Sequence, residues 1–219
     1  WSHVIGDARG VTGSGDAPGS NLRFVLDPLD WKRERGNGAQ DMRHRFIGSF
    51  VYELPLGHGK RYGSGWNAGL NAILSEWSVG SIVTLTSGTP QHLTVAGNPA
   101  NVGGGDRPDV VPGTSWKLDN PDPSGFYNPD AFVPNEPFTF GDAGKNILVG
   151  PGTIGWDFSL FKNIRISEKY GVQFRAEAFN FPNHPNFQFP NAQVGNRNFG
   201  MISVARAQRI MQLGVKFVF

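Results

Sequence analysis

The sequence predicts an all-β protein that forms part of a transmembrane, antiparallel, up-and-down β-barrel. Five stretches alternate apolar and polar residues with the period of two that is typical of strands. They run for about 10–13 residues, longer than the usual 5–6 of soluble sheets and close to the 9–11 of a tilted membrane strand. The connections between them alternate between long and short, as the loops and turns of barrels do.

The composition agrees with this class. The 219 residues include 30 glycines and 16 prolines, which favours strands joined by irregular loops over a helical bundle. A net charge of +2 predicts no nucleic-acid partner. Cysteine is absent, which excludes disulfides and thiolate metal sites, and no apolar run is long enough for a transmembrane helix. Because the chain starts at Trp1 without a signal peptide, we interpret it as a piece of a longer protein.

The first two predicted strands are residues 44–55 and 77–87, and a sixth strand is expected to end within Trp1–Val4. The first strand places these large apolar residues on one face: Phe46, Phe50, Tyr52 and Leu54. The second aligns Trp77, Val79, Val83 and Leu85. Ile82 lies on the opposite face, which weakens the alternation there.

The next two predicted strands are 153–166 and 170–181, and Lys162 interrupts the apolar face of the first. In a barrel, apolar faces contact lipid and polar faces line the lumen. We therefore expect these aromatic residues to face lipid: Phe50, Tyr52, Trp156, Phe158, Tyr170 and Phe174. We expect these polar residues to face the lumen: Asp157, Arg165, Gln173, Arg175 and Glu177.

The last predicted strand, 208–219, ends the chain on "QLGVKFVF". One face is wholly apolar and carries Met211, Leu213, Val215, Phe217 and Phe219. An edge strand of a soluble sandwich would show the same pattern, so this strand alone leaves both architectures open.

The connections fall into two groups. The long loops are expected at 5–42, 88–152 and 182–207, on the extracellular side if the chain ends at the periplasm. The connections 56–76 and 167–170 then face the periplasm. The first of these is long for a periplasmic turn, and "NAGLNAILSEW" within it predicts a short helix.

No group of residues predicts catalysis, a metal site or a cofactor, so the protein is not expected to be an enzyme. "GHGKRYGSG" lacks the Walker A spacing, because Gly57 and Gly59 are too close and Arg61 follows Lys60; we interpret it as a turn. The histidines have no metal-ligand spacing: His3, His44, His58, His92 and His184. The loop aspartates do not match an EF-hand and are expected in solvated loops: Asp106, Asp109, Asp119, Asp122 and Asp130.

Several stretches resemble one family. "GPGTIGWDFSLFKNIRISEKYGVQFRAEAFNFPNHPNFQFP" is similar to the C-terminal barrel region of TonB-dependent outer-membrane receptors, and closest to the Oar-like subgroup with an N-terminal carboxypeptidase-regulatory-like domain. "DMRHRFIGSFVYELPLGHG", "EWSVGSIVTLTSGTP", "GGDRPDVVPG" and "FYNPDAFVP" also match, in the right order, from about Asp41 onward. Glu76 stands where the family usually has glycine, a departure we expect to be harmless on a polar turn.

The resemblance implies a receptor that takes up a scarce ligand across the outer membrane of a Gram-negative-type bacterium. About six C-terminal strands of a barrel of about 22 would lie in residues 1–219, as an open curved sheet, with the plug, TonB box and N-terminal domains absent from this chain. A TonB-type energy-transducing complex, outer-membrane lipid and an unidentified ligand are the implied partners. Arg175 and Glu177 would pair across strands or touch the plug.

The resemblance also explains the end of the chain. Outer-membrane proteins typically end in a β-signal, and Gln212, Gly214, Phe217 and Phe219 match its pattern. The barrel-assembly machinery is then the partner of this strand, whose edge offers unpaired backbone groups. The alternative function is a soluble extracellular β-sandwich for binding or adhesion. It would have to bury the crowded apolar faces in water.

Overall fold

The computed structural model describes residues 1–6, 26–27, 29–101, 106–167 and 169–219. These residues form two compact units. Unit 1 consists of Trp1–Arg45, Thr86–Thr153 and Asn186–Arg206. Unit 2 consists of Phe46–Leu85, Ile154–Pro185 and Ala207–Phe219.

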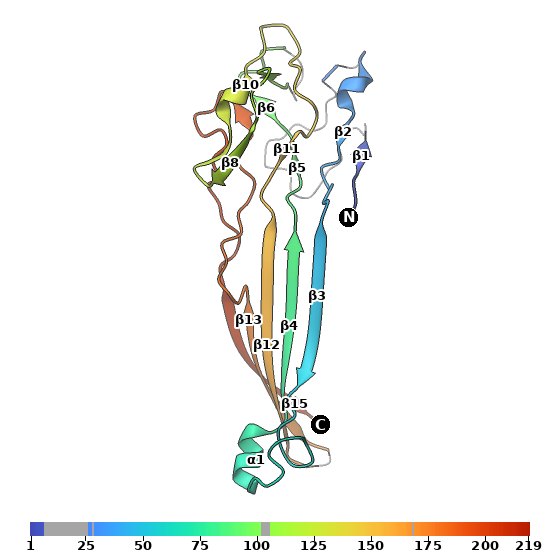
Figure 1. Ribbon diagram of the computed structural model, residues 1–219, viewed down its shortest axis with the longest axis vertical. Coiled ribbons are helices and arrows are strands. Elements are labelled where there is room, and N and C mark those ends of the chain that lie inside the picture. The colour runs from blue at the N-terminus through green and yellow to red at the C-terminus, as the bar shows by residue number, and fades with distance from the viewer. Residues whose placement is uncertain (7–25, 28, 102–105, 168) are drawn as a thin grey trace. The chain divides into compact units, whose positions relative to one another are not determined.

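Unit 2 is built on a five-stranded sheet. Its strands are β3 (Arg45–Glu53), β4 (Trp77–Thr86), β12 (Thr153–Arg165), β13 (Gly171–Phe179) and β15 (Ile210–Val218). They lie in the order β15-β13-β12-β4-β3 (Figure 1), so each of the five is next to its neighbour along the chain. This is the up-and-down arrangement that the sequence predicts, and each strand lies within its predicted range.

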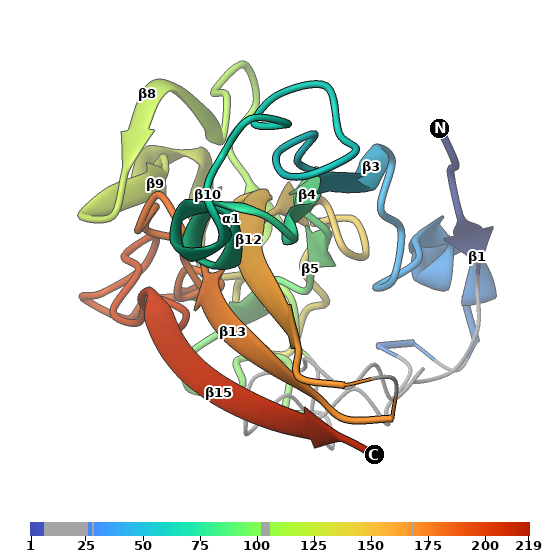
Figure 2. The same cartoon turned by 90° about the horizontal axis from the view of Figure 1, so that it is seen from below.

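The sheet is open and curved. Seen along the strands in Figure 2, it runs from β15 to β3 without closing on itself. Among the described residues, β3 pairs only with β4, and β15 only with β13. Both outer strands therefore present one edge of backbone groups without a strand partner. The expected open curved sheet is confirmed.

The strand register fixes which residues share a face. β12 and β13 are antiparallel, with Leu160 opposite Ala176, and β13 and β15 are antiparallel, with Ala176 opposite Leu213. Residues directly opposite each other project to the same side of a sheet. Leu160, Ala176 and Leu213 thus form one row across three strands, and their sequence neighbours form the opposite face.

The connection from β3 to β4 contains the predicted helix, α1 (Ala68–Leu74). Asn67 caps its start, because the Asn67 side chain accepts a hydrogen bond from the Leu70 amide at 2.8 Å. The glycine-rich stretch before α1 forms turns, as predicted, with Gly57 and Gly63 at positive φ. Glu76, after α1, has φ 59°. A positive φ favours glycine. The glutamate at this position therefore carries a free-energy cost in its backbone conformation, contrary to our expectation that the departure is harmless.

Unit 1 is folded, although its residues were predicted to lie mainly in irregular loops. Its short elements are β1 (Ile5–Gly6), η1 (Trp31–Glu34), β2 (Gly36–Asn37), β5 (Pro90–Gln91), β6 (Thr94–Val95), β7 (Asp109–Val110), β8 (Lys117–Asp122), β9 (Gly125–Tyr127), η2 (Pro129–Ala131), β10 (Phe132–Val133), β11 (Leu148–Val149) and β14 (Gln193–Val194). They pair as β1-β2, β5-β11, β6-β14, β7-β10 and β8-β9. The expected strand within Trp1–Val4 is not formed; β1 follows it and is two residues long.

A hydrophobic core explains why unit 1 holds together. Its buried residues are Leu93, Tyr127, Ala131, Phe132, Ala143, Leu148 and Val194. Phe132 and Phe199 pack edge to face, with their ring centroids 5.9 Å apart. The residues of this core come from 88–152 and from 182–207, so the two long connections fold together.

Candidate functional site

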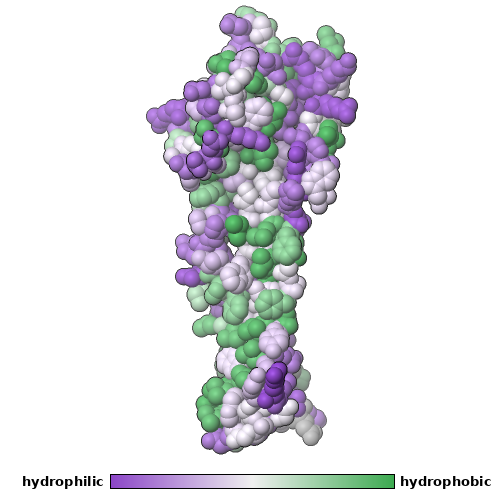
Figure 3. Space-filling view, in the orientation of Figure 1, coloured by the Kyte–Doolittle hydropathy of each residue, from purple (hydrophilic) through white to green (hydrophobic). Residues whose placement is uncertain are grey.

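One face of the unit 2 sheet is apolar across all five strands, and we call it the apolar face. It carries Phe46, Phe50, Tyr52, Trp77, Val79, Val83, Leu85, Ile154, Trp156, Phe158, Leu160, Ile164, Val172, Phe174, Ala176, Ala178, Met211, Leu213, Val215 and Phe217. Many of these side chains are open to the surroundings; Leu213 is 86% exposed. Hydrophobic side chains also colour the surface at the level of these strands in Figure 3.

Five of the six aromatic residues predicted to face lipid lie on this apolar face. Phe50, Tyr52, Trp156 and Phe174 are exposed there, whereas Phe158 is half-buried against Phe181, with ring centroids 5.3 Å apart. Tyr170, the sixth, is exposed in the turn before β13 rather than in a strand.

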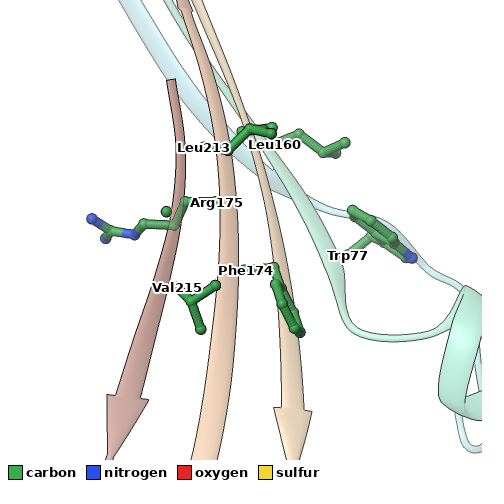
Figure 4. A pocket seen from close by; sticks show the side chains of 8 residues that line it. Trp77, Leu160, Phe174, Arg175, Leu213 and Val215 are labelled. Atoms are coloured by element: carbon green, nitrogen blue, oxygen red, sulfur yellow. The ribbon is translucent and has the colours of Figure 1, made fainter. Parts of the chain in front are cut away.

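A shallow groove crosses the apolar face. It is lined by Trp77, Leu160, Phe174, Arg175, Ala176, Leu213, Gly214 and Val215. Figure 4 shows the Arg175 side chain pointing away from Leu160, Phe174 and Val215, so its guanidinium belongs to the opposite face. The groove is thus bounded by hydrocarbon and aromatic surface.

The opposite face, which we call the polar face, carries all five residues predicted to line a lumen. The Asp157 carboxylate accepts a hydrogen bond from the Asn180 amide at 2.9 Å, and Glu177 accepts one from the Gln212 side chain. Gln173 and the exposed Arg165 lie on the same face. The sequence had left cross-strand pairing open for Glu177, and Gln212 on β15 is that partner.

Arg175 is held in place by its neighbours on the polar face. Its guanidinium donates from Nε to the Gln173 side-chain oxygen at 2.8 Å. It also lies 5.2 Å from the ring centroid of Phe161, directly opposite on β12, in a cation–π contact. The Gln173 amide in turn donates to Asn163 at 2.8 Å. These contacts join the polar faces of β12 and β13.

Lys162 interrupts the apolar face but is itself only 5% exposed. Its ammonium donates a hydrogen bond to the Ser75 carbonyl oxygen and lies 5.6 Å from the centre of the Trp77 ring. The end of the β3–β4 connection therefore covers this cation. The sequence alone showed the interruption but not what covers it.

The four residues of the predicted β-signal occupy distinct positions on β15. Gln212 contacts Glu177, and Gly214 lies opposite Arg175. Phe217 projects from the apolar face, opposite Val172. Phe219 follows β15 and is 95% exposed. The ring of Phe219 therefore contributes almost no packing within unit 2.

Unit 1 contains a buried ion cluster that the sequence analysis missed. Arg107, 1% exposed, donates to Glu34 at 2.7 Å and to the Arg33 carbonyl at 3.1 Å. Lys145 lies 3.4 Å from the other Glu34 oxygen. Burial lowers the pKa of Arg107, while the Glu34 carboxylate opposes that change. The sequence carried no local signal for this cluster, since Glu34 and Arg107 are 73 residues apart.

Asp106 was predicted in a solvated loop, and that prediction was wrong. Asp106 is buried, its carboxylate accepts hydrogen bonds from the Ala100 amide at 2.9 Å and from Asn135, and these bonds compensate its burial. Asp119, Asp122 and Asp130 are exposed, as expected.

His92 is the histidine whose environment departs most from water. Burial, with help from the nearby Arg107 cation, lowers the pKa of His92 to about 4, so it is neutral at pH 7. Among the described residues, no three of the His, Asp or Glu side chains gather as a metal site. Within the same part of the chain, none of the helices has the length and apolar character needed to traverse a bilayer.

A family model described as "Outer membrane beta barrel domain" matches residues 1–212. The chain belongs to this family. Searches of curated proteins and of solved structures gave no match.

Membership of the outer membrane β-barrel domain family places the chain in the outer membrane, as part of a barrel. It also accounts for the open sheet, since its edges are the places where barrel strands join. A soluble β-sandwich would need a second sheet over the apolar face. In the described part of unit 2, the five-stranded sheet has no such cover, and the sandwich does not fit the family.

Proposed function

We propose that this chain is a wall segment of a TonB-dependent receptor that takes up a scarce ligand across the outer membrane. The observation that carries the proposal is the five-stranded up-and-down sheet with one apolar face, one polar face and two open edges. The motif resemblance to Oar-like receptors adds the class of barrel. In this proposal the apolar face contacts lipid and the polar face lines the lumen.

The open edges argue for a barrel larger than these strands. In the hydrocarbon core of a membrane, every backbone amide and carbonyl needs a hydrogen-bond partner. β3 and β15 each lack a strand partner on one side in the described residues, so further strands have to complete the wall. A large barrel leaves room for a plug, and the Arg175 and Glu177 row supplies a polar surface for that plug to contact.

The lengths of the connections orient the wall. At one end of unit 2, β12 and β13 are joined by a tight turn in which the Ile166 and Ser167 amides both donate to the Tyr170 carbonyl. The connections from β4 to β12 and from β13 to β15 are long and fold into unit 1. Barrels place short turns in the periplasm and long loops outside. We therefore assign unit 1 to the extracellular, ligand-contacting side and α1 to the periplasmic side.

The proposal includes no catalysis. The Asp157 and Glu177 carboxylates of the polar face are engaged in hydrogen bonds that stabilise the sheet. The implied partners are the TonB-type complex, the barrel-assembly machinery acting on β15, lipid and the transported ligand.

Binding of the energy-transducing partner tests the proposal. The intact protein that contains this chain is purified in detergent and titrated with the periplasmic domain of the organism's TonB-type protein. We expect binding that disappears when the region preceding the barrel is deleted. The deleted protein is also reconstituted into planar bilayers as a check that its barrel is intact. No binding by the intact protein, together with passive conductance through it, would overturn the proposal in favour of a porin-like channel.

A further inference from the structure

The C-terminal end of the β3–β4 connection is bound to the apolar face of the sheet. Two side chains of the apolar face reach it. The Trp77 indole N–H donates to the Ile73 carbonyl at 2.9 Å, and the Lys162 ammonium donates to the Ser75 carbonyl. Because Ile73 is in α1 and Ser75 ends it, the C-terminal end of the helix is bound to the lipid-facing side.

α1 turns an apolar surface away from the protein. Leu70, Ile73 and Leu74 are 46%, 65% and 40% exposed. Their spacing of i, i+3 and i+4 puts them on one face of a helix. α1 contains no charged residue. Hydrophobic colour also marks the surface over α1 in Figure 3. Isolated helices this short are marginal in water, so burial of that face would stabilise α1 further.

The same connection carries two cations. Residues 56–76 contain the basic residues Lys60 and Arg61 and one acidic residue, Glu76, at their end. The Arg61 guanidinium lies over the Tyr62 ring, 5.5 Å from its centroid, and Tyr62 is exposed. Lys60 is 3.6 Å from Glu53 at the end of β3. Two cations and an exposed aromatic ring in the same connection as an exposed apolar helix face match the headgroup layer of an anionic membrane.

We propose that residues 56–76 are an interfacial anchor that binds anionic phospholipid of the periplasmic leaflet. The face of Leu70, Ile73 and Leu74 lies at the boundary of headgroups and acyl chains, while Lys60 and Arg61 contact phosphate. The anchor explains why this connection is longer than a periplasmic turn requires. The inference rests on the orientation proposed above, but it does not depend on energised uptake.

Site-directed spin labelling tests the depth of the helix. The 219 residues contain no cysteine, so a single introduced cysteine gives a unique label in this chain, with any upstream cysteine replaced. Ile73→Cys and, on the opposite side of α1, the exposed Ala72→Cys are compared in the intact protein in phosphatidylcholine–phosphatidylglycerol bilayers. We expect the label at 73 about 5–10 Å below the headgroup surface, accessible to oxygen but not to a water-soluble nickel chelate. The label at 72 should show the reverse.

The preference of the protein for anionic lipid tests the role of Lys60 and Arg61. Native mass spectrometry counts phosphatidylglycerol retained by the intact protein and by the double variant Lys60→Gln, Arg61→Gln. We expect the double variant to lose preference for phosphatidylglycerol, by about fivefold for each basic residue. Lys216→Gln, on the polar face, is the matched control and should leave the preference unchanged.

Three results would overturn the inference. The first is equal access of the nickel chelate to labels at 72 and 73. The second is unchanged phosphatidylglycerol retention in the double variant. The third is labelling of Ile73→Cys by a membrane-impermeant reagent on intact cells, which would put α1 outside. Each can occur whether or not the protein binds a TonB-type partner, so failure of the anchor is distinguishable from failure of the proposed function.

Discussion

The ammonium of Lys162 on β12 donates a hydrogen bond to the carbonyl oxygen of Ser75, 87 residues earlier in the chain. Lys162 is the one charged residue on the apolar face among the described residues of unit 2. An unpaired cation on a lipid-facing surface is costly. Ser75 and Trp77 remove that cost by covering the ammonium, and the same contact fastens the β3–β4 connection to the wall.

Lys162→Ala should loosen that connection. It removes the hydrogen bond to Ser75 and leaves the buried carbonyl without its cationic donor, so we expect a loss of about 1–3 kcal/mol of unfolding free energy. Urea unfolding of the intact protein in lipid vesicles, followed by tryptophan fluorescence, measures it. Lys216→Ala on the polar face is the control, with an expected change within about 0.5 kcal/mol. Equal effects of the two variants would contradict the role given to Lys162.

Arginine substitutions at neighbouring positions of β12 test which face of the sheet contacts lipid. Leu160→Arg puts a charge on the apolar face near the middle of the strand and should cost about 2–4 kcal/mol in a bilayer. Ser159→Arg puts the same side chain on the polar face, opposite Glu177, where it gains a carboxylate partner. Its effect should be small. Folding into vesicles measures both, and greater damage from Ser159→Arg would reverse the assignment of the faces.

Unit 1 should lose stability in acid through His92. The unfolded chain takes up a proton near pH 6.5, but burial lowers the pKa of His92 to about 4 in the folded protein. Between these values the unfolded state binds more protons, so stability rises with pH. At 1.36 kcal/mol for each pKa unit, about 3 kcal/mol is lost by pH 4. Protease protection of unit 1 across this range measures the loss.

His92→Gln provides the comparison for the acid experiment. A glutamine cannot titrate, so the variant should keep the same protease protection from pH 6.5 to pH 4, whatever its stability at pH 7. If wild type and variant lose protection in parallel, then other groups cause the acid sensitivity.

Removal of Phe219 should impair assembly without weakening the folded barrel. Phe219 is 95% exposed and follows the last strand, so its loss should change unfolding free energy by no more than about 0.5 kcal/mol. If the barrel-assembly machinery reads this residue, the amount of protein inserted in the outer membrane falls. Heat-modifiability of the band on gels of outer-membrane fractions measures insertion. Normal insertion of the shortened protein would show that Phe219 is not part of the β-signal.

The long strands were predictable because their information is local. A strand shows its two faces in the alternation of its own residues, and the pairing Leu160–Ala176–Leu213 follows once three such strands are aligned. The helix α1 was also predictable, from the short stretch that contains it. Tyr170 was placed in a strand because alternation does not define where a strand ends.

The contacts that hold unit 1 together were not predictable in the same way. Arg107 and Glu34 are 73 residues apart, and neither lies in a periodic segment. The motif resemblance includes the stretch around Arg107, but only the folded chain brings the Glu34 carboxylate next to the Arg107 guanidinium. For the same reason Asp106 was expected in solvent, since a short stretch rich in glycine and proline does not reveal the Ala100 amide and Asn135 side chain that surround the carboxylate.

By itself, the sequence determined five long strands with an apolar and a polar face, because side-chain alternation with period two is a property of each segment alone. The tertiary structure decided how Lys162 is tolerated, where α1 is fastened and how unit 1 forms a core. Each of those features depends on groups that are far apart in the chain. A polar group without a partner in lipid, or an apolar group exposed to water, costs free energy, and that cost is cancelled only when folding brings the groups into contact.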